Sequence, residues 1–220
     1  MSSIAVLIPA RGGSKRLLGK NLLPLAGMPL INHSIKYALS FKELFNGVFV
    51  STDDDQIAQV AVEAGAEVIK RPAEFATDEA TSAAVALHAL AHLPEITRSL
   101  VLLQPTNPLR PDGMMQQLLG TYEKGSFDSV FTVSPLHKKV GQIKESQFVP
   151  VNYSFGERSQ DNQPLYFENG LAYISSVDVI RQNKIIGDQH GTLVVDHVYG
   201  GVDIDTMEDF EYAEWLVGRW

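Results

Sequence analysis

Apolar residues gather along the chain in short blocks, and their spacing switches between two patterns. Some blocks are nearly continuous apolar runs rich in β-branched residues, which is typical of strands buried on both faces of a sheet. These runs are 4–8, 47–52, 66–70, 99–103 and 128–134. Between them apolar residues recur at helical spacing, which predicts helices at 29–39, 56–64, 77–93 and 112–124. This alternation predicts βαβ units with right-handed crossovers and a mostly parallel sheet.

The alternation stops at residue 135 and resumes near residue 168. The intervening segment 135–167 is polar and irregular, yet Phe148, Tyr153 and Phe155 help to make it too apolar for a disordered chain. We therefore expect one domain over 1–220, with 135–167 as an insertion that packs on the core or on a second subunit. Beyond it, the pattern predicts a strand to 174, a helix at 177–182, a strand at 192–196 and an amphipathic helix to 217.

Charge and composition narrow the class of protein. A net charge of −8 argues against a protein that binds nucleic acid or an anionic membrane. The chain has no cysteine, which excludes disulfides and thiolate catalysis and fits a reducing compartment. No stretch approaches the roughly 20 apolar residues that a membrane span needs. We expect a soluble, cytoplasmic α/β protein whose 220 residues suffice for a full core.

The first predicted strand runs into a loop that is both glycine-rich and basic. This glycine loop contains Arg11, Gly12, Gly13, Lys15, Arg16, Gly19 and Lys20. Glycines let a backbone fold tightly around a ligand, and the cations supply charge where phosphate oxygens would lie. The spacing matches neither a Walker loop nor a dinucleotide fingerprint. A flexible surface loop is the alternative, but four cations stand out in an acidic chain. We therefore predict a nucleotide phosphate site.

Other polar stretches follow predicted strands and would lie on the same rim of a parallel sheet. The aspartates 53–55 begin a helix and are expected to cap it, with a metal site or one carboxylate facing the nucleotide as alternatives. Arg71 ends the third strand, and the proline-rich loop 104–111 is suited to holding a substrate. Thr77 and Asp78 are interpreted as the N-terminal cap of the next helix.

Near the C-terminus, Asp203 and Asp205 are two residues apart in an extended stretch, so their carboxylates point to the same side. Such a pair suits a hard cation, and Mg²⁺ prefers one or two carboxylates plus phosphate and water oxygens. The alternative is that Asp205 or Thr206 caps the last helix, which leaves Asp203 unexplained. Together with the basic loop, the pair indicates nucleotidyl or phosphoryl transfer.

Several stretches, in this order, resemble the acylneuraminate cytidylyltransferases, which are CMP-sialic acid synthetases. They are 8–15 with 19–21, then 50–53, 71–74, 103–110, Asn169-Gly170 with Tyr173, and 203–206. The resemblance covers nearly the whole chain and is weakest in 135–167. It implies a three-layer α/β/α, Rossmann-like nucleotidyltransferase fold in which 135–167 is a dimerisation or substrate-lid segment. It also implies a homodimer that condenses CTP with a nine-carbon 2-keto-3-deoxy sugar acid, with Mg²⁺ or Mn²⁺ present, and releases pyrophosphate.

The resemblance implies roles for the matching residues. The catalytic residues would be Arg11, Lys20, Asp203 and Asp205, and the two aspartates would bind the metal. The nucleotide would be bound by Ala10, Arg11, Gly12, Gly13, Ser14, Lys20, Asn21, Arg71 and Ser82. Within that set, Asn21 and Arg71 would read cytosine and Ser82 would lie against the ribose. The sugar acid would be bound by Gln104, Arg158, Asn169 and Tyr173.

Two residues depart from the family's pattern. Glu168 precedes Asn169, and Asn107 follows Thr106 where a serine is expected. Both departures point to a sugar acid other than N-acetylneuraminate, such as legionaminate. The alternatives within the same fold are a CMP-3-deoxy-octulosonate synthetase or a nucleotidyltransferase acting on sugar 1-phosphates. From another class, a non-catalytic nucleotide-binding module would keep the glycine loop but would need no paired carboxylates.

Overall fold

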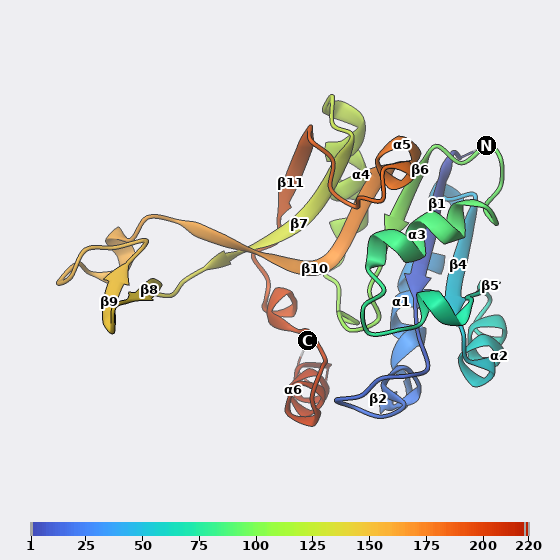
Figure 1. The fold of residues 1–220 in the computed structure, drawn as a ribbon, viewed down its shortest axis with the longest axis horizontal. Helices are drawn as coiled ribbons and strands as arrows, with labels where there is room; N and C mark the ends of the chain where they lie inside the picture. The colour runs from blue at the N-terminus through green and yellow to red at the C-terminus, as the bar shows by residue number, and fades with distance from the viewer. Residues whose placement is uncertain (1, 218, 220) are drawn as a thin grey trace.

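The computed structural model describes residues 2–217 and 219 of the chain (Figure 1). Its centre is a seven-stranded sheet in the order β11-β7-β10-β6-β1-β4-β5. The strands are β1 (Ile4–Pro9), β4 (Gly47–Thr52), β5 (Glu67–Lys70), β6 (Ser99–Leu102), β7 (Ser129–Leu136), β10 (Leu165–Ser176) and β11 (His190–Val194). Two short antiparallel pairs lie outside this sheet, β2 (Pro24–Leu25) with β3 (Met28–Pro29) and β8 (Gly141–Lys144) with β9 (Gln147–Pro150).

The sheet is mostly parallel, as predicted. Strand β1 is parallel to both β4 and β6, β4 is parallel to β5, and β7 is parallel to β11. Strand β10 is antiparallel to its neighbours β6 and β7. Because β10 runs in the opposite direction, Tyr173 in its middle is paired with Leu102, the last residue of β6. The sequence pattern predicted this strand but not its direction.

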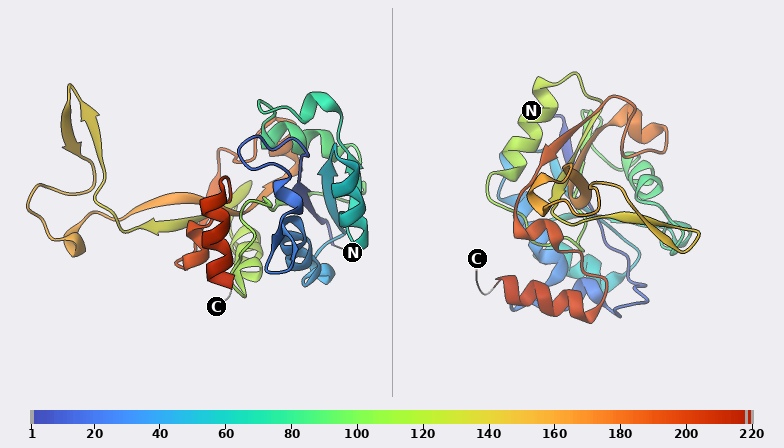
Figure 2. Two further views of the ribbon diagram at one scale, coloured as in Figure 1. Left: turned by 90° about the horizontal axis from the view of Figure 1, so that it is seen from below. Right: turned by 90° about the vertical axis from the view of Figure 1, so that its left-hand side faces the viewer.

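The sheet is buried on both faces, as its apolar runs predicted. In β1, Val6 and Ile8 belong to the core on one face, and Ala5 and Leu7 to the core on the other. The first face is covered by α1 (Leu30–Leu39), α2 (Asp55–Glu63) and α4 (Met114–Lys124). The second is covered by α3 (Ser82–Leu90) and α5 (Val177–Arg181). Figure 2 shows the resulting three layers, which confirm the expected fold class.

A third apolar cluster joins the start of the chain to its end. Leu17 and Leu25, which follow β1, pack in this cluster with Ile204 and with Phe210 and Leu216 of α6 (Met207–Val217). The contact between these distant segments holds the glycine loop close to Asp203 and Asp205. The cluster therefore positions the two halves of the predicted site.

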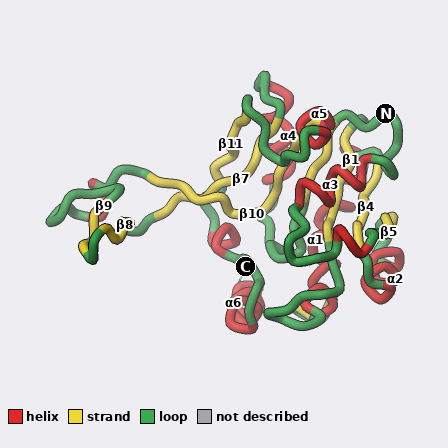
Figure 3. Tube along the Cα trace, viewed as in Figure 1, coloured by secondary structure: helices red, strands yellow, loops and turns green. Residues whose placement is uncertain are grey.

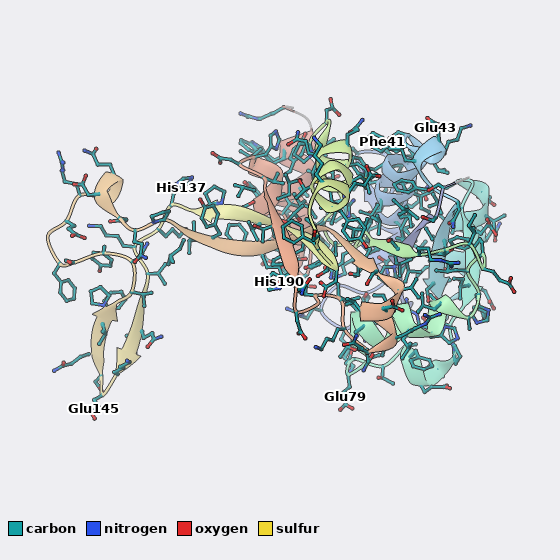
Figure 4. All side chains as sticks on the ribbon, turned by 90° about the horizontal axis from the view of Figure 1, so that it is seen from above. Phe41, Glu43, Glu79, His137, Glu145 and His190 are labelled. Atoms are coloured by element: carbon teal, nitrogen blue, oxygen red, sulfur yellow. The ribbon has the colours of Figure 1, made fainter. Side chains whose placement is uncertain are left out.

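The inserted segment projects from the body of the molecule as an arm, which extends to the left in Figure 1. Strands β7 and β10 form its base, where Leu136 is paired with Leu165. The hairpin β8–β9 lies farther out and turns at Glu145 and Ser146, which both have positive φ. Figure 4 labels His137 at the base and Glu145 at the hairpin tip. The hairpin does not pack on the core of its own chain.

The helix predicted from residue 77 begins later than expected. Residues 77–81 form a turn, and Thr81 Oγ1 caps α3 by accepting a hydrogen bond from Ala84 N–H at 3.1 Å. Asp78 does not cap this helix, because its carboxylate is bound by cations of the glycine loop. The prediction of a cap at Thr77 and Asp78 was therefore wrong.

Figure 3 separates helices, strands and loops by colour. The connections include short 3₁₀ helices at Lys20–Leu22, Lys42–Leu44, Ala73–Phe75, Ser159–Asp161 and Val198–Gly201. Within the described residues, no helix is long and apolar enough to span a membrane.

Candidate functional site

A cavity of about 550 Å³ opens where β1 and β6 end. Its walls come from the glycine loop, the turn before α3, the loop after β6 and the stretch before α6. The described residues that line it are Pro9, Arg11, Ser14, Lys15, Arg16, Leu17, Lys20, Asn21, Arg71, Asp78, Ala80, Ser82, Val85, Gln104, Pro105, Thr106 and Asp205. The parallel strands bring these distant segments to one rim, which is the usual place for a ligand in an open α/β sheet.

The glycine loop is held against the N-terminus of α2. The N–H of Gly12 donates to Asp53 Oδ1 at 3.0 Å. A Cβ atom on Gly12 would lie 2.6 Å from Asp54 Oδ2, so a larger residue would push the loop away from the helix. Asp54 caps α2 by accepting hydrogen bonds from Gln56 and Ile57. The predicted capping role is therefore confirmed for Asp54, and Asp53 instead orients the loop.

One carboxylate reaches the glycine loop from the turn before α3. Asp78 Oδ1 lies 2.6 Å from Arg11 Nη2, and the other oxygen of Asp78 is bound by Lys15. The hydrogen bond from Lys15, with a further contribution from Arg11, holds the pKa of the Asp78 carboxyl below its usual value. The sequence did not reveal Asp78 as a site residue, because a Thr-Asp pair before an apolar run also fits a helix cap.

A second carboxylate reaches the loop from the far end of the chain. Asp205 lies 2.9 Å from Lys20 Nζ and 2.9 Å from Arg16 Nη2. Lys20 is buried, and its Nζ also donates to the carbonyl of Ile204 at 2.7 Å. A buried ammonium group requires such partners. Two of the predicted catalytic residues, Lys20 and Asp205, are therefore in direct contact.

The last helix has its own cap, which leaves Asp205 for other contacts. Thr206 Oγ1 accepts a hydrogen bond from Asp209 N–H at 3.3 Å. The Asp209 carboxylate accepts in return from the N–H groups of Thr206 at 2.8 Å and Asp205 at 3.0 Å. Of the two capping alternatives considered for this stretch, Thr206 is the residue that caps.

Asn21 and Arg71, which were predicted to read the base, are buried and line the cavity. The Asn21 amide donates to the carbonyl of Arg11 at 3.0 Å and closes the glycine loop on itself. Arg71 is bound to β4, where its Nε donates to Ser51 Oγ at 3.1 Å and its Nη2 to the Ser51 carbonyl. Burial lowers the pKa of Arg71 to about 10, against the opposing effect of Asp53. The guanidinium is therefore held in one orientation.

Asp203 and Asp205 flank Ile204, which is fully buried. The Asp203 side chain is partly buried but still reaches solvent. This burial raises the pKa of the Asp203 carboxyl, and the negative charge of Asp205 raises it further. A hydrogen bond with Thr106 opposes the shift. Concentrated negative charge on hard oxygen ligands fits Mg²⁺ or Mn²⁺. Within the described residues, no group of three or more His, Cys, Asp or Glu side chains could hold a metal ion, so further ligands would come from phosphate and water.

Of the four predicted sugar-binding residues, Gln104 lines the cavity, whereas Asn169 and Tyr173 are bound to other protein groups. Asn169 is buried, and its amide accepts a hydrogen bond from the Thr132 hydroxyl at 2.6 Å and donates one to Ser134 Oγ at 2.9 Å. Tyr173 is also buried, and its hydroxyl donates to Glu168 at 2.6 Å. Asn169 and Tyr173 therefore have protein partners, and neither is among the residues that line the cavity.

Asn107 connects β10 to the stretch that carries the paired aspartates. It is buried, and its Nδ2 donates to the carbonyls of Asn169 at 3.1 Å and Val202 at 2.8 Å. Gly170 has a φ of +72°, and a Cβ atom there would lie 2.7 Å from Asn107 Oδ1. The departure from an expected serine at position 107 thus has a structural explanation, since the amide joins a carbonyl within β10 to the carbonyl of Val202, which precedes Asp203.

The fourth predicted sugar-binding residue, Arg158, lies elsewhere. It belongs to the arm, is exposed, and is paired with Asp161 at 2.9 Å. Because the arm projects away from the body, Arg158 is not part of the cavity lining in its own chain. Arg158 therefore does not reach the cavity of its own chain, and its contact with the sugar acid stays a prediction.

The structure brings most of the other predicted residues together. Those that line the cavity are Arg11, Ser14, Lys20, Asn21, Arg71, Ser82, Gln104 and Asp205. Ala10, Gly12 and Gly13 are outside the lining but adjoin these residues in the chain, and Asp203 is outside it two residues before Asp205. Asp78 and Thr106 line the cavity and had not been predicted as site residues. Thr106 lies within 103–110, one of the stretches that resemble the family. That stretch was the signal in the sequence that could have identified Thr106 as a site residue.

Comparison with known proteins identifies the family to which the chain belongs. The cytidylyltransferase family model matches residues 5–217, nearly the whole chain. The chain belongs to the cytidylyltransferase family. The chain is 34% identical over 211 residues to the N-acylneuraminate cytidylyltransferase of Streptococcus agalactiae serotype III (strain NEM316), with 93% of the chain and 51% of the relative covered. It is also 34% identical over 224 residues to the CMP-N,N'-diacetyllegionaminic acid synthase of Legionella pneumophila, with 97% and 96% covered.

The chain thus spans about half the length of the streptococcal relative but nearly all of the Legionella one. A solved structure of CMP:2-keto-3-deoxy-manno-octonic acid synthetase complexed with CTP resembles it with a TM-score of 0.74. That match covers 99% of both chains at 20% sequence identity, which shows a shared fold. The resemblance found in the sequence motifs is confirmed at the level of the family.

Proposed function

We propose that this cytidylyltransferase condenses CTP with a 2-keto-3-deoxy sugar acid to give the CMP-sugar and pyrophosphate. The sugar acid would be an N-acylneuraminate or a close relative such as a legionaminate, in keeping with the names of the two bacterial relatives. The contact between Lys20 and Asp205 carries the proposal. It joins a cation suited to phosphate and a carboxylate suited to a metal in one cavity.

The cavity offers the groups that a cytidine triphosphate would need. Arg11 and Lys20 would bind phosphate oxygens, and Ser82, in the first turn of α3, would lie against the ribose. Arg71 is held on β4 with its guanidinium at the cavity wall, where it would donate to the base. Asn21 would lie beside it, since both residues line the same cavity.

In the proposed reaction the anomeric hydroxyl oxygen of the sugar acid attacks the α-phosphorus of CTP. One O–P bond forms, the bond from the α-phosphorus to the bridging oxygen breaks, the hydroxyl loses its proton, and pyrophosphate leaves. Arg11 and Lys20 would offset the charge that grows on pyrophosphate. The chain's main tasks are positioning and charge stabilisation, and no covalent enzyme intermediate is required.

Asp203 and Asp205 would hold the divalent cation, which when bound polarises phosphate oxygens and lowers the pKa of a nearby hydroxyl. Lys20 would keep the Asp205 carboxylate directed into the cavity, because Lys20 itself is fixed by the Ile204 carbonyl. Gln104, which lines the cavity, would contact the sugar acid.

We also infer a homodimer formed through the arm. Large apolar side chains are exposed there, including Ile143 at 71% and Phe155 at 72%. Exposed apolar surface on a projecting hairpin is unfavourable in water unless another surface covers it. A second copy would present the same apolar face, as in a two-fold symmetric interface. We also propose that the protein is cytoplasmic, in keeping with its proposed use of CTP.

An acceptor panel tests the proposed reaction. The protein would be incubated with CTP, Mg²⁺ and one of four acceptors: N-acetylneuraminate, N,N'-diacetyllegionaminate, 3-deoxy-octulosonate or a hexose 1-phosphate. Pyrophosphate release should be fastest with one of the two nine-carbon acids. Release only with the hexose 1-phosphate, or only when UTP replaces CTP, would contradict the proposal. Preference for the octulosonate would support the alternative within the same fold.

A second measurement separates the enzyme from a binding module. Asp203→Asn should abolish pyrophosphate release while part of the CTP binding remains, because Asp203 is outside the cavity lining but beside Asp205. Asp188→Asn is a matched control, since Asp188 is exposed and paired with Lys184 far from the cavity lining. A wild-type protein that binds CTP but releases no pyrophosphate with any acceptor would indicate the non-catalytic module.

A further inference from the structure

Two carboxylates balance the four cations of the glycine loop, and only one of them has a role in the proposed reaction. Asp205 pairs with Arg16 and Lys20 and belongs to the proposed metal site. Asp78 bridges Arg11 and Lys15 in the same way but is not needed for metal binding or for any bond that changes. Its place, between two cations that line the phosphate side of the cavity, needs an explanation of its own.

The Asp78 contacts join two walls of the cavity. Arg11 and Lys15 belong to the glycine loop, whereas Asp78 belongs to the turn before α3, and all three residues line the cavity. Neither carboxylate oxygen of Asp78 is left unpaired, since one lies 2.6 Å from Arg11 and the other is bound by Lys15. A carboxylate that bridges two cations occupies the position that a phosphate group would take between them.

The turn that contains Asp78 is exposed enough for Asp78 to separate from Arg11 and Lys15. Residues 77–79 are exposed and lie in a turn outside the regular elements, while α3 has its separate cap at Thr81. The side chains of Asp78 and Lys15 are 39% and 82% exposed. Water can therefore solvate both groups once they separate, and the ion pairs can be exchanged at modest free-energy cost.

We propose that Asp78 is a displaceable counter-ion of the phosphate site. It holds Arg11 and Lys15 in the nucleotide-free protein, and the triphosphate of the nucleotide takes both cations from it. This inference rests on the proposed function only in naming the anion as a nucleotide triphosphate. Asp78 thereby limits the affinity for phosphate compounds, because each of them competes with a carboxylate built into the chain.

The opposite role for Asp78 predicts the opposite result. If Asp78 instead held Arg11 and Lys15 in position for phosphate, its removal would disorder these side chains and weaken phosphate binding. A neutral substitution therefore separates the two roles by the direction of the change in affinity. Glu79 offers a matched control, since it is the adjacent residue, is exposed, and points away from the body in Figure 4.

Calorimetric titration with inorganic tripolyphosphate, without divalent cations and at low salt, tests the proposal. Asp78→Asn and Asp78→Ser should bind tripolyphosphate about fivefold more tightly than the wild type, the order expected for two part-exposed ion pairs. Asp78→Glu, which restores the carboxylate, should bind within about twofold of the wild type, and so should Glu79→Gln. Circular dichroism would confirm that each variant is folded.

Unchanged or weaker binding in both folded neutral variants would overturn the proposal, and so would an equal gain in Glu79→Gln. Tripolyphosphate carries neither base nor sugar, so this experiment is independent of the acceptor panel. Tighter binding together with a failed acceptor panel would leave the counter-ion role standing without the proposed reaction. Pyrophosphate release in the panel without tighter binding would remove only the counter-ion role.

Discussion

Lys20 and Asp205 are 185 residues apart in the sequence, yet their side chains are in contact at 2.9 Å. The contact exists because the segment after β1 and the last helix share one apolar cluster. Lys20 also donates a hydrogen bond to the carbonyl of Ile204. Thr206 caps α6, so the Asp205 side chain is not needed as the cap. Asp205 is therefore oriented by a buried cation, which is an arrangement that suits a metal ligand in a charged site.

Replacing Asp205 by Asn should remove activity without unfolding the protein. Asn keeps the shape of the side chain but lacks the charge for a metal and for Lys20, so kcat/KM should fall by about 100-fold or more. The free energy of unfolding should fall by no more than about 1–2 kcal/mol, because the buried Lys20 keeps the Ile204 carbonyl as an acceptor and the Asn amide oxygen can accept in place of the carboxylate. Pyrophosphate release and urea denaturation measure the two effects.

The control for this substitution is Asp178→Asn, which removes an exposed carboxylate paired with Arg181 on α5. This variant should match the wild type in both measurements. Equal kcat/KM values for Asp205→Asn and Asp178→Asn would contradict the catalytic role of Asp205.

The sequence was sufficient to predict the layers and much of the cavity, because both depend on local patterns. Apolar runs such as 4–8 mark buried strands wherever they lie in the sheet, and residues that follow parallel strands share one rim. For this reason Arg11, Arg71 and Gln104 could be placed at one site before their contacts were known. Local spacing also predicted that Asp54 would cap α2.

The remaining features depend on contacts that have no local signal. The direction of β10 follows from its pairing with β6 and β7, and a strand has the same alternation in either direction. Asp78 has the sequence of a helix cap, but two distant cations bind it instead. Arg158 lies on an arm whose path away from the body is not encoded in its irregular polar sequence. In each case a tertiary contact overrode the local preference.

Arg71→Lys should weaken CTP binding more than it slows turnover. The Arg71 guanidinium is buried and fixed on Ser51, and a lysine ammonium cannot reproduce its planar set of donors. The loss of one charge-assisted hydrogen bond to the nucleotide predicts a KM for CTP raised about tenfold or more, with a smaller change in kcat. Steady-state kinetics with varied CTP measures both constants.

Arg181→Lys is the control for the effects on KM and kcat, and it should leave both unchanged. The Arg181 side chain is 68% exposed on α5 and is not part of the cavity lining. A KM for CTP that stays at the wild-type value in Arg71→Lys would show that Arg71 does not contact the nucleotide.

Asn107→Ala should destabilise the fold by about 2–3 kcal/mol. The substitution leaves two buried carbonyls, those of Asn169 and Val202, without their donor. Urea denaturation measures the free energy of unfolding, with Gln116→Ala as the control because Gln116 is exposed on α4 and should shift it by no more than about 0.5 kcal/mol. Equal stability of the two variants would show that the Asn107 amide does not stabilise these two carbonyls.

Phe155→Asp should convert the proposed homodimer to a monomer while the body of the molecule stays folded. Phe155 is 72% exposed on the arm, and covering one phenylalanine from each copy would contribute about 3–6 kcal/mol to association. Its replacement by a charged residue should therefore raise the dimer Kd by roughly 100-fold or more. Analytical ultracentrifugation measures this change, with Val62→Asp as the control because Val62 is a 61% exposed apolar residue on α2. A wild type that is monomeric at micromolar concentration, or a Phe155→Asp variant that dimerises as tightly as Val62→Asp, would rule out the arm as the dimer contact.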